Sequence, residues 1–207
     1  MERIQIILFL VLGQLAVGGT FLLSLPSLTT VGIAFYRTNG IVFGVTLLLG
    51  YLIGGPPGET GVFQNSFFIF FSLFAITLFF YNLRLWFRRP YSSASLLWTA
   101  ATLGTASLLS LLFYMGQELS ILRRLWLSLY FVISSLLLGS GVLAMLLGHS
   151  YLTRPALSIV PLQQLSKIFM GLVFLEGGIA IMNLIVAAQS ASIWDALLLK
   201  TFEGLFI

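Results

Sequence analysis

The sequence predicts an all-α integral membrane protein, a polytopic helical bundle with six to seven transmembrane helices. Of its 207 residues, 59% are hydrophobic and only 8% are charged, whereas a soluble domain carries about 25% charged residues. The apolar residues form continuous runs, which favours helices over the alternating pattern of membrane strands. Each run approaches the roughly 20 residues that a helix needs to cross a bilayer.

Six apolar runs are predicted to span the membrane within a single transmembrane domain, residues 1–207. They cover residues 4–25, 32–54, 65–87, 94–115, 125–148 and 165–189. Residues 190–207 carry three charges among Leu and Phe, which is typical of an interfacial helix or of the start of a seventh span. The apolar ending Gly-Leu-Phe-Ile lacks a polar flank, so both a complete chain and the front part of a longer protein stay open.

The first two runs have clear ends. The first ends at Pro26 and is longer than the hydrophobic region of a signal peptide, so we predict a retained span rather than a cleaved leader. The second contains Arg37 and Asn39 near its start. It ends in Gly-Gly-Pro-Pro-Gly-Glu-Thr-Gly, residues 54–61, which is the clearest loop signal in the chain.

The remaining runs are separated by polar or proline-containing segments. The third run is rich in Phe and stops at Arg-Arg-Pro, residues 88–90. The fourth is weakened by Thr and Ser, and residues 116–124 form a polar connection to the fifth. A loop is predicted over residues 149–164, bounded by Pro155 and Pro161, and its half-apolar pattern suggests that it lies along the membrane interface.

Lysine and arginine predict the orientation, because cytoplasmic loops carry an excess of both. With six spans, the N-terminal side holds Arg3, Arg123 and Arg124, and the opposite side holds Arg37, Arg84, Arg88, Arg89, Arg154 and Lys167. Six against three predicts an external N-terminus in a bacterial-type inner (plasma) membrane. The net charge of +4 is explained by these helix-end cations and anionic lipid headgroups, so nucleic acid is not an expected partner.

Glu176 is the sharpest candidate for a ligand or proton site. It lies near the middle of the sixth run, where an ionised carboxylate is costly, so we expect the group to be protonated or paired. Ala180, Asn183 and Ala187 follow on the same helical face and are expected to turn towards other helices. Gln14, at a similar depth, is a candidate partner; the alternative for these polar residues is ordinary hydrogen bonding between helices.

His149 and Arg154 are candidates for binding a cofactor near the headgroups. His149 is the only histidine, so it could be one axial ligand or bond a quinone carbonyl, but not build a multi-histidine metal site. The alternative is a polar residue ending a helix. Arg37, Arg84, Arg154 and Lys167 could form an anion pocket; the alternative is snorkelling anchors.

Gly40 and Gly44 form a G-x-x-x-G pattern, which permits another helix to approach closely. The chain has no cysteine and none of the common nucleotide, hydrolase or zinc motifs. We therefore predict no catalytic residue and no metal site, and the sequence identifies no particular cofactor.

Three functions follow from these patterns. The first is a non-catalytic membrane subunit of a larger electron-transfer or energy-converting complex. It would pack lipid, quinone or pigment, and its partners would be the bilayer and other membrane subunits. The second is a small-solute transporter or permease component with a midplane site around Glu176, Asn183 and Gln14. A membrane enzyme that uses His149 and Arg154 is the least favoured of the three.

Overall fold

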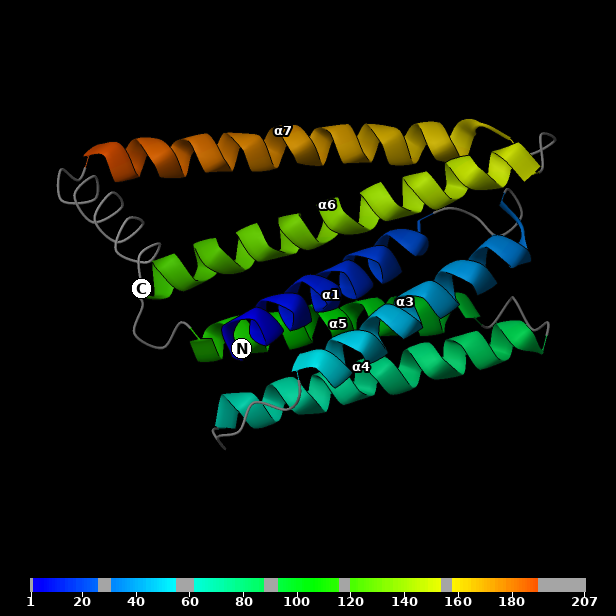
Figure 1. The fold of residues 1–207 in the computed structure, drawn as a ribbon, viewed down its shortest axis with the longest axis horizontal. Helices are drawn as coiled ribbons and strands as arrows, with labels where there is room; N and C mark the ends of the chain where they lie inside the picture. The colour runs from blue at the N-terminus through cyan, green and yellow to red at the C-terminus, as the bar shows by residue number, and fades with distance from the viewer. Residues whose placement is uncertain are drawn as a thin grey trace. The chain divides into compact units, whose positions relative to one another are not determined.

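The computed structural model describes residues 2–25, 31–54, 62–87, 93–115, 120–153 and 158–189. This part of the chain is helical and contains no strand (Figure 1). The helices are α1 (Glu2–Leu23), α3 (Ile33–Gly54), α4 (Val62–Trp86), α5 (Ser93–Met115), α6 (Ile121–Thr153) and α7 (Val160–Gln189). The predicted all-α class is confirmed.

Five of these helices are long and apolar enough to cross a membrane, namely α3, α4, α5, α6 and α7, and α1 adds the shorter apolar segment Ile7–Leu23. The apolar segments of α6 and α7 contain 32 and 26 residues. At 1.5 Å per residue they are about 48 and 39 Å long, against a hydrocarbon core of about 30 Å. Both helices must therefore tilt or extend into the headgroup layer.

The chain divides into two compact units, Met1–Leu172 and Val173–Ile207. In the first unit α1 contacts α3, α5 and α6, while α4 packs against α5 and α3 (Figure 1). The centre of this unit is therefore α1, and Ala16, Val17 and Leu23 on it are almost completely buried. The described part of the second unit is the remainder of α7.

The contact between α1 and α6 is a direct approach of two backbones. A Cβ atom on Gly18 would overlap the carbonyl of Ser135, and one on Gly139 would overlap the backbone of Gly18. The Ser135 hydroxyl donates a hydrogen bond of 2.7 Å to the backbone carbonyl of Gln14. Small residues allow helices to pack this closely in lipid, where contact and hydrogen bonds drive association.

Two of the predicted connections are shorter than expected. The helices α1, α3, α4 and α5 begin and end within three residues of the predicted bounds. The predicted loop over residues 149–164 was wrong at both ends, because α6 continues to Thr153 and α7 begins at Val160. Pro161 lies in the first turn of α7, where a missing backbone N–H breaks no helical hydrogen bond.

The polar stretch before the fifth span is also partly helical. Arg123 and Arg124 lie in the first turn of α6 rather than in a connection, because long basic side chains extend to the interface without breaking a helix. Between α6 and α7, the Tyr151 hydroxyl donates a hydrogen bond to the Ser158 carbonyl. The predictions for Pro155, for the loop at residues 55–61 and for residues 190–207 concern positions outside the described residues.

Candidate functional site

Glu176 lies on α7 in the second unit. Its Oε2 atom is buried and accepts no hydrogen bond from the part of the chain that the structure describes. The side chain is half-buried, whereas Ala180 and Asn183 are exposed, and Asn183 has an interaction of its own. The side chain of Ala187 is outside the described set. A ligand or proton site at Glu176 stays a prediction. The buried Oε2 atom, which has no partner among the described residues, is a candidate contact for such a ligand or proton.

Gln14, the suggested partner of Glu176, is buried on α1 in the first unit. Its backbone carbonyl accepts the hydrogen bond from Ser135, so this position contributes to the contact between α1 and α6. Ser135 was not among the residues predicted from the sequence. The available signal was the Ser135-x-x-x-Gly139 spacing, a pair of small residues one helical turn apart.

His149 is exposed near the C-terminal end of α6, and Arg154 is not among the described residues. Their predicted role in binding a cofactor is therefore not tested. Among the described residues, no group of three His, Cys, Asp or Glu side chains is placed to hold a metal ion. Lys167 lies beside a small cavity of about 280 Å³ that Leu25 and Pro161 also line.

Arg37 binds the C-terminal end of α4. Its Nε and Nη2 donate hydrogen bonds of 2.9 and 2.6 Å to the Leu85 carbonyl, and Nη2 donates a third, of 3.0 Å, to the Trp86 carbonyl. The guanidinium carbon also lies 5.9 Å from the centre of the Trp86 ring. Helix C-terminal carbonyls lack partners within their own helix and carry partial negative charge, so this cation caps α4.

A side chain of α4 packs against the Gly40–Gly44 pattern of α3. Asn82 donates hydrogen bonds of 3.1 Å to the Gly40 carbonyl and 3.0 Å to the Leu78 carbonyl. A Cβ on Gly40 would overlap the Asn82 side-chain oxygen, and one on Gly44 would lie 3.8 Å from its nitrogen. The predicted close approach therefore occurs at Gly40, and its partner Asn82 was not predicted from the sequence.

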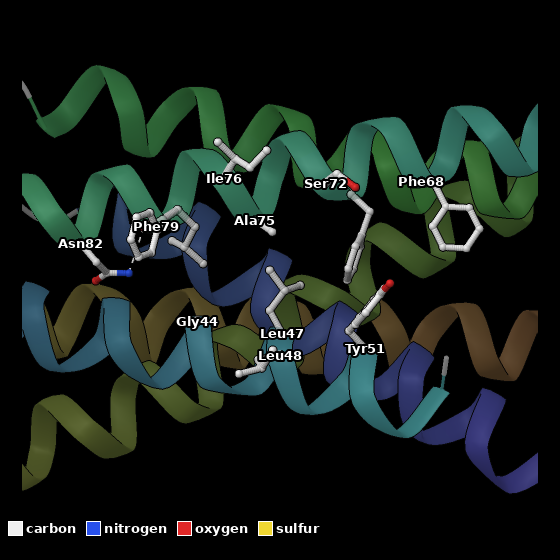
Figure 2. A pocket seen from close by; sticks show the side chains of 12 residues that line it. Gly44, Leu47, Leu48, Tyr51, Phe68, Ser72, Ala75, Ile76, Phe79 and Asn82 are labelled. Atoms are coloured by element: carbon white, nitrogen blue, oxygen red, sulfur yellow. Dashed lines mark hydrogen bonds between the residues drawn. The ribbon is translucent and has the colours of Figure 1, made fainter. Parts of the chain in front are cut away.

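A cavity of about 460 Å³ lies between α3 and α4. Figure 2 shows Phe68, Ser72 and Ala75 on α4 facing Leu47 and Tyr51 on α3, with Asn82 at one end. Its lining is mainly apolar and aromatic, and the polar side chains among it belong to Tyr51, Ser72 and Asn82. This size and composition match the pockets that hold small apolar ligands, which are about 300–1,000 Å³.

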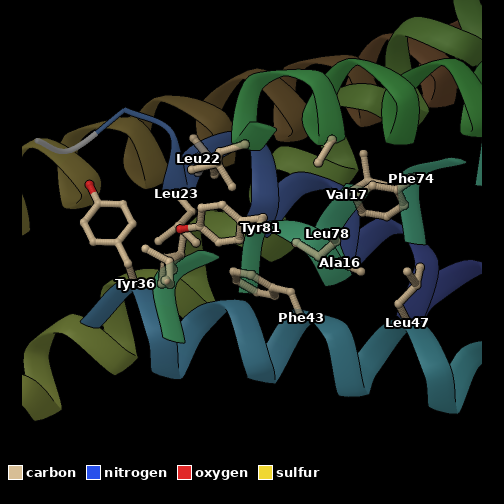
Figure 3. Close-up of a cluster of buried hydrophobic side chains, with 14 of the residues drawn as sticks. Ala16, Val17, Leu22, Leu23, Tyr36, Phe43, Leu47, Phe74, Leu78 and Tyr81 are labelled. Carbon is tan, nitrogen blue, oxygen red and sulfur yellow. The ribbon is translucent and has the colours of Figure 1, made fainter. Parts of the chain in front are cut away.

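A second polar feature lies inside the apolar core of the first unit. Asn39 and Tyr81 are almost completely buried, and neither Oδ1 of Asn39 nor the Tyr81 hydroxyl has a hydrogen-bond partner in the described structure. Figure 3 shows Tyr81 among Leu23, Phe43 and Leu78. Buried polar groups are nearly always hydrogen-bonded, to protein or to ordered water, so both atoms are exceptions that need an explanation.

No protein-family model, no curated protein and no solved structure matches this chain. The fold and the surfaces described above define its class, a multi-pass helical membrane protein with a lipid environment.

Proposed function

We propose that the chain is a non-catalytic integral membrane subunit of a larger membrane complex, with residues 1–207 forming one transmembrane domain. Electron-transfer and energy-converting complexes are the class proposed, in a bacterial-type inner membrane and with the N-terminus outside. This class rests on the Phe-rich third run, the short loops and the small-residue patterns of the sequence. The partners would be other membrane helices together with lipid.

One observation carries the proposal, namely the contrast between two groups of glycines. Gly18 and Gly139 are in direct contact with a neighbouring helix. On α7, by contrast, no atom of the described residues lies within 4 Å of the position that a Cβ would take on Gly171, Gly177 or Gly178. Each glycine in a helix interior is about 1 kcal/mol less favourable than alanine. A helix of another subunit, packed against these glycines, would offset that cost.

Two of these glycines define where the partner helix would pack. Gly171 and Gly178 are seven residues apart, so they lie on the same face of α7. Leucine at both positions should block a closely packed partner, because its side chain would occupy the space that the glycines leave. Ser166 is also exposed on α7 but lies five residues before Gly171, about 140° away around the helix, so Ser166→Leu is a matched control.

The test is purification from native membranes in a mild detergent. We expect the wild-type chain and Ser166→Leu to copurify with haem-bearing or pigment-bearing subunits, detected by visible absorption, and the Gly171→Leu/Gly178→Leu variant to lose them. A chain that purifies alone, without absorbing subunits, contradicts the proposal. Equal assembly of the double variant and the control contradicts the assignment of α7 as the contact surface.

A small-solute transporter is the second candidate, and the buried Oε2 of Glu176 favours it. A carboxylate at membrane depth needs a proton or a partner, and a transported ion or solute could supply either. The site would include Asn183, which lies in the same unit as Glu176. In liposomes, Glu176→Gln should keep assembly but abolish uptake, since the amide retains hydrogen-bonding capacity and loses the acid. Unchanged uptake would assign Glu176 to structure.

A further inference from the structure

The cavity between α3 and α4 opens sideways at membrane depth. The segments Ile33–Ile53 and Ser66–Trp86 that flank it are both long and apolar enough to span the bilayer. Leu48, Ile76 and Phe79 line the cavity and remain 56%, 52% and 63% exposed, while Leu47 and Leu78 on its floor are buried. The space is therefore a groove whose open side faces hydrocarbon, and we call it the α3–α4 groove.

The α3–α4 groove has the length of one acyl chain. At one end α3 and α4 are joined by the hydrogen bond between Asn82 and Gly40. At the other end Tyr51 stacks on Phe71, with ring centres 6.4 Å apart. Eleven residues separate these contacts on each helix, which corresponds to about 16 Å. Half of a hydrocarbon core of about 30 Å, the depth of one leaflet, is about 15 Å.

A cation lies at the Asn82 end of the α3–α4 groove. Arg37, Gly44 and Tyr51 are spaced seven residues apart, so Arg37 continues the helix face that lines the groove. Hydrogen bonds to the Leu85 and Trp86 carbonyls hold its guanidinium there. These three bonds come from Nε and Nη2, and a guanidinium has five N–H donors, so among the described residues the two Nη1 donors have no acceptor.

The charges around this end favour an anion. The full positive charge of Arg37 exceeds the roughly half negative charge at the C-terminus of α4. Residues 60–117 contain no Asp or Glu, whereas Arg84, Arg88 and Arg89 all lie within them. Trp86 is exposed beside Arg37, and tryptophan is enriched where hydrocarbon meets headgroups. An apolar groove with a cation at its headgroup end is complementary to a lipid with a negative headgroup.

We propose that the α3–α4 groove is a binding site for an anionic phospholipid. One acyl chain lies between α3 and α4, and the phosphate accepts hydrogen bonds from the Nη1 donors of Arg37. The aromatic side chains Phe68, Phe71 and Phe79 pack against the chain. The inference does not depend on the proposed function, because it uses only contacts within the first unit.

The test is native mass spectrometry of the delipidated protein in detergent. Phosphatidylglycerol, phosphatidylcholine and inorganic phosphate are added separately at equal concentrations. We expect phosphatidylglycerol to bind at least about tenfold more tightly than phosphatidylcholine, because the phosphatidylcholine headgroup neutralises its own phosphate. Inorganic phosphate alone should not bind. Equal retention of both lipids, or binding of phosphate alone, overturns the proposal.

Two substitutions on α4 locate the acyl chain. Ala75→Trp fills the α3–α4 groove, whereas Thr77→Trp, two residues further on, places the same side chain on a different face of the helix. Phosphatidylglycerol binding should fall at least tenfold for Ala75→Trp and stay at the wild-type level for Thr77→Trp. Circular dichroism checks the fold of both variants. Equal binding by two folded variants excludes the groove as the site.

Arg37→Gln tests the headgroup contact. The amide can still donate to an α4 carbonyl, but the charge is lost. The preference for phosphatidylglycerol over phosphatidylcholine should disappear while general lipid retention persists. An unchanged preference in a folded variant removes Arg37 from the site. If Arg37→Gln does not fold, the lipid preference of the wild type and the Ala75→Trp comparison still decide the proposal.

Discussion

Because of the close contact between α1 and α6, we expect Gly18→Ala to lower the free energy of unfolding. The added methyl group would overlap the carbonyl of Ser135, which is backbone and cannot rotate away. The two helices must therefore separate. Overpacking of this kind costs about 1–3 kcal/mol. Separation also weakens the hydrogen bond from Ser135 to Gln14, which is worth about 0.6 kcal/mol for an average contact between membrane helices.

Gly13→Ala is the matched control for this substitution. Gly13 lies on the same helix, but no atom of the described residues lies within 4 Å of its Cβ position. Both substitutions gain the helix propensity of alanine, about 1 kcal/mol, so that gain cancels in the comparison. The free energy of unfolding of Gly18→Ala should therefore lie about 2–4 kcal/mol below that of Gly13→Ala.

The assay is unfolding by sodium dodecyl sulfate in mixed micelles, followed by circular dichroism. Gly139→Ala should resemble Gly18→Ala, because its methyl group would meet the backbone of Gly18. The double variant should cost less than the sum of the two, since one separation of the helices relieves both overlaps. Equal stabilities for Gly18→Ala and Gly13→Ala would refute the backbone contact and the packing argument built on it.

Three further predictions concern single substitutions in the same protein. Tyr81→Phe should raise the free energy of unfolding by about 1 kcal/mol or more, because the buried hydroxyl has no described partner; a decrease would reveal a bond, such as one to an internal water. Asn82→Leu should lower it by about 1 kcal/mol through the loss of two hydrogen bonds, measured by the same titration. Cysteine at Gly58 should react with an impermeant reagent from outside and cysteine at Ser92 from the cytoplasm, and the reverse pattern would contradict the predicted orientation.

The positions of the helices could be predicted from the sequence wherever a long apolar run marked them. In hydrocarbon a backbone must satisfy its own hydrogen bonds, so a run of about 20 apolar residues has few alternatives to a helix. The predicted ends of the first two runs lie within two residues of the ends of α1 and α3. The predicted ends around residues 149–164 were wrong, because polar residues and a first-turn proline were read as helix breaks.

A candidate site could be predicted from the sequence only where the depth of a single residue within a membrane span was informative. Glu176 was singled out because a carboxyl group within a spanning helix is expensive, and this depends on position along one helix alone. The α3–α4 groove was not predicted, because its lining combines residues from two helices. Arg37 was recognised as unusual for its depth, but its role as the cap of α4 depends on carbonyls 48 and 49 residues away in the chain.

Membrane-length helices could be predicted from the amino-acid sequence, since their hydrogen bonds are local and their apolar residues are consecutive. Which helix faces pack together is visible only in the folded protein. Gly13 and Gly18 are the same residue on the same helix, yet no described atom lies within 4 Å of a Cβ built on Gly13, whereas one built on Gly18 would overlap α6. In lipid all apolar faces are nearly equivalent, so pairing depends on the fit of small groups and on single hydrogen bonds between residues distant in the chain.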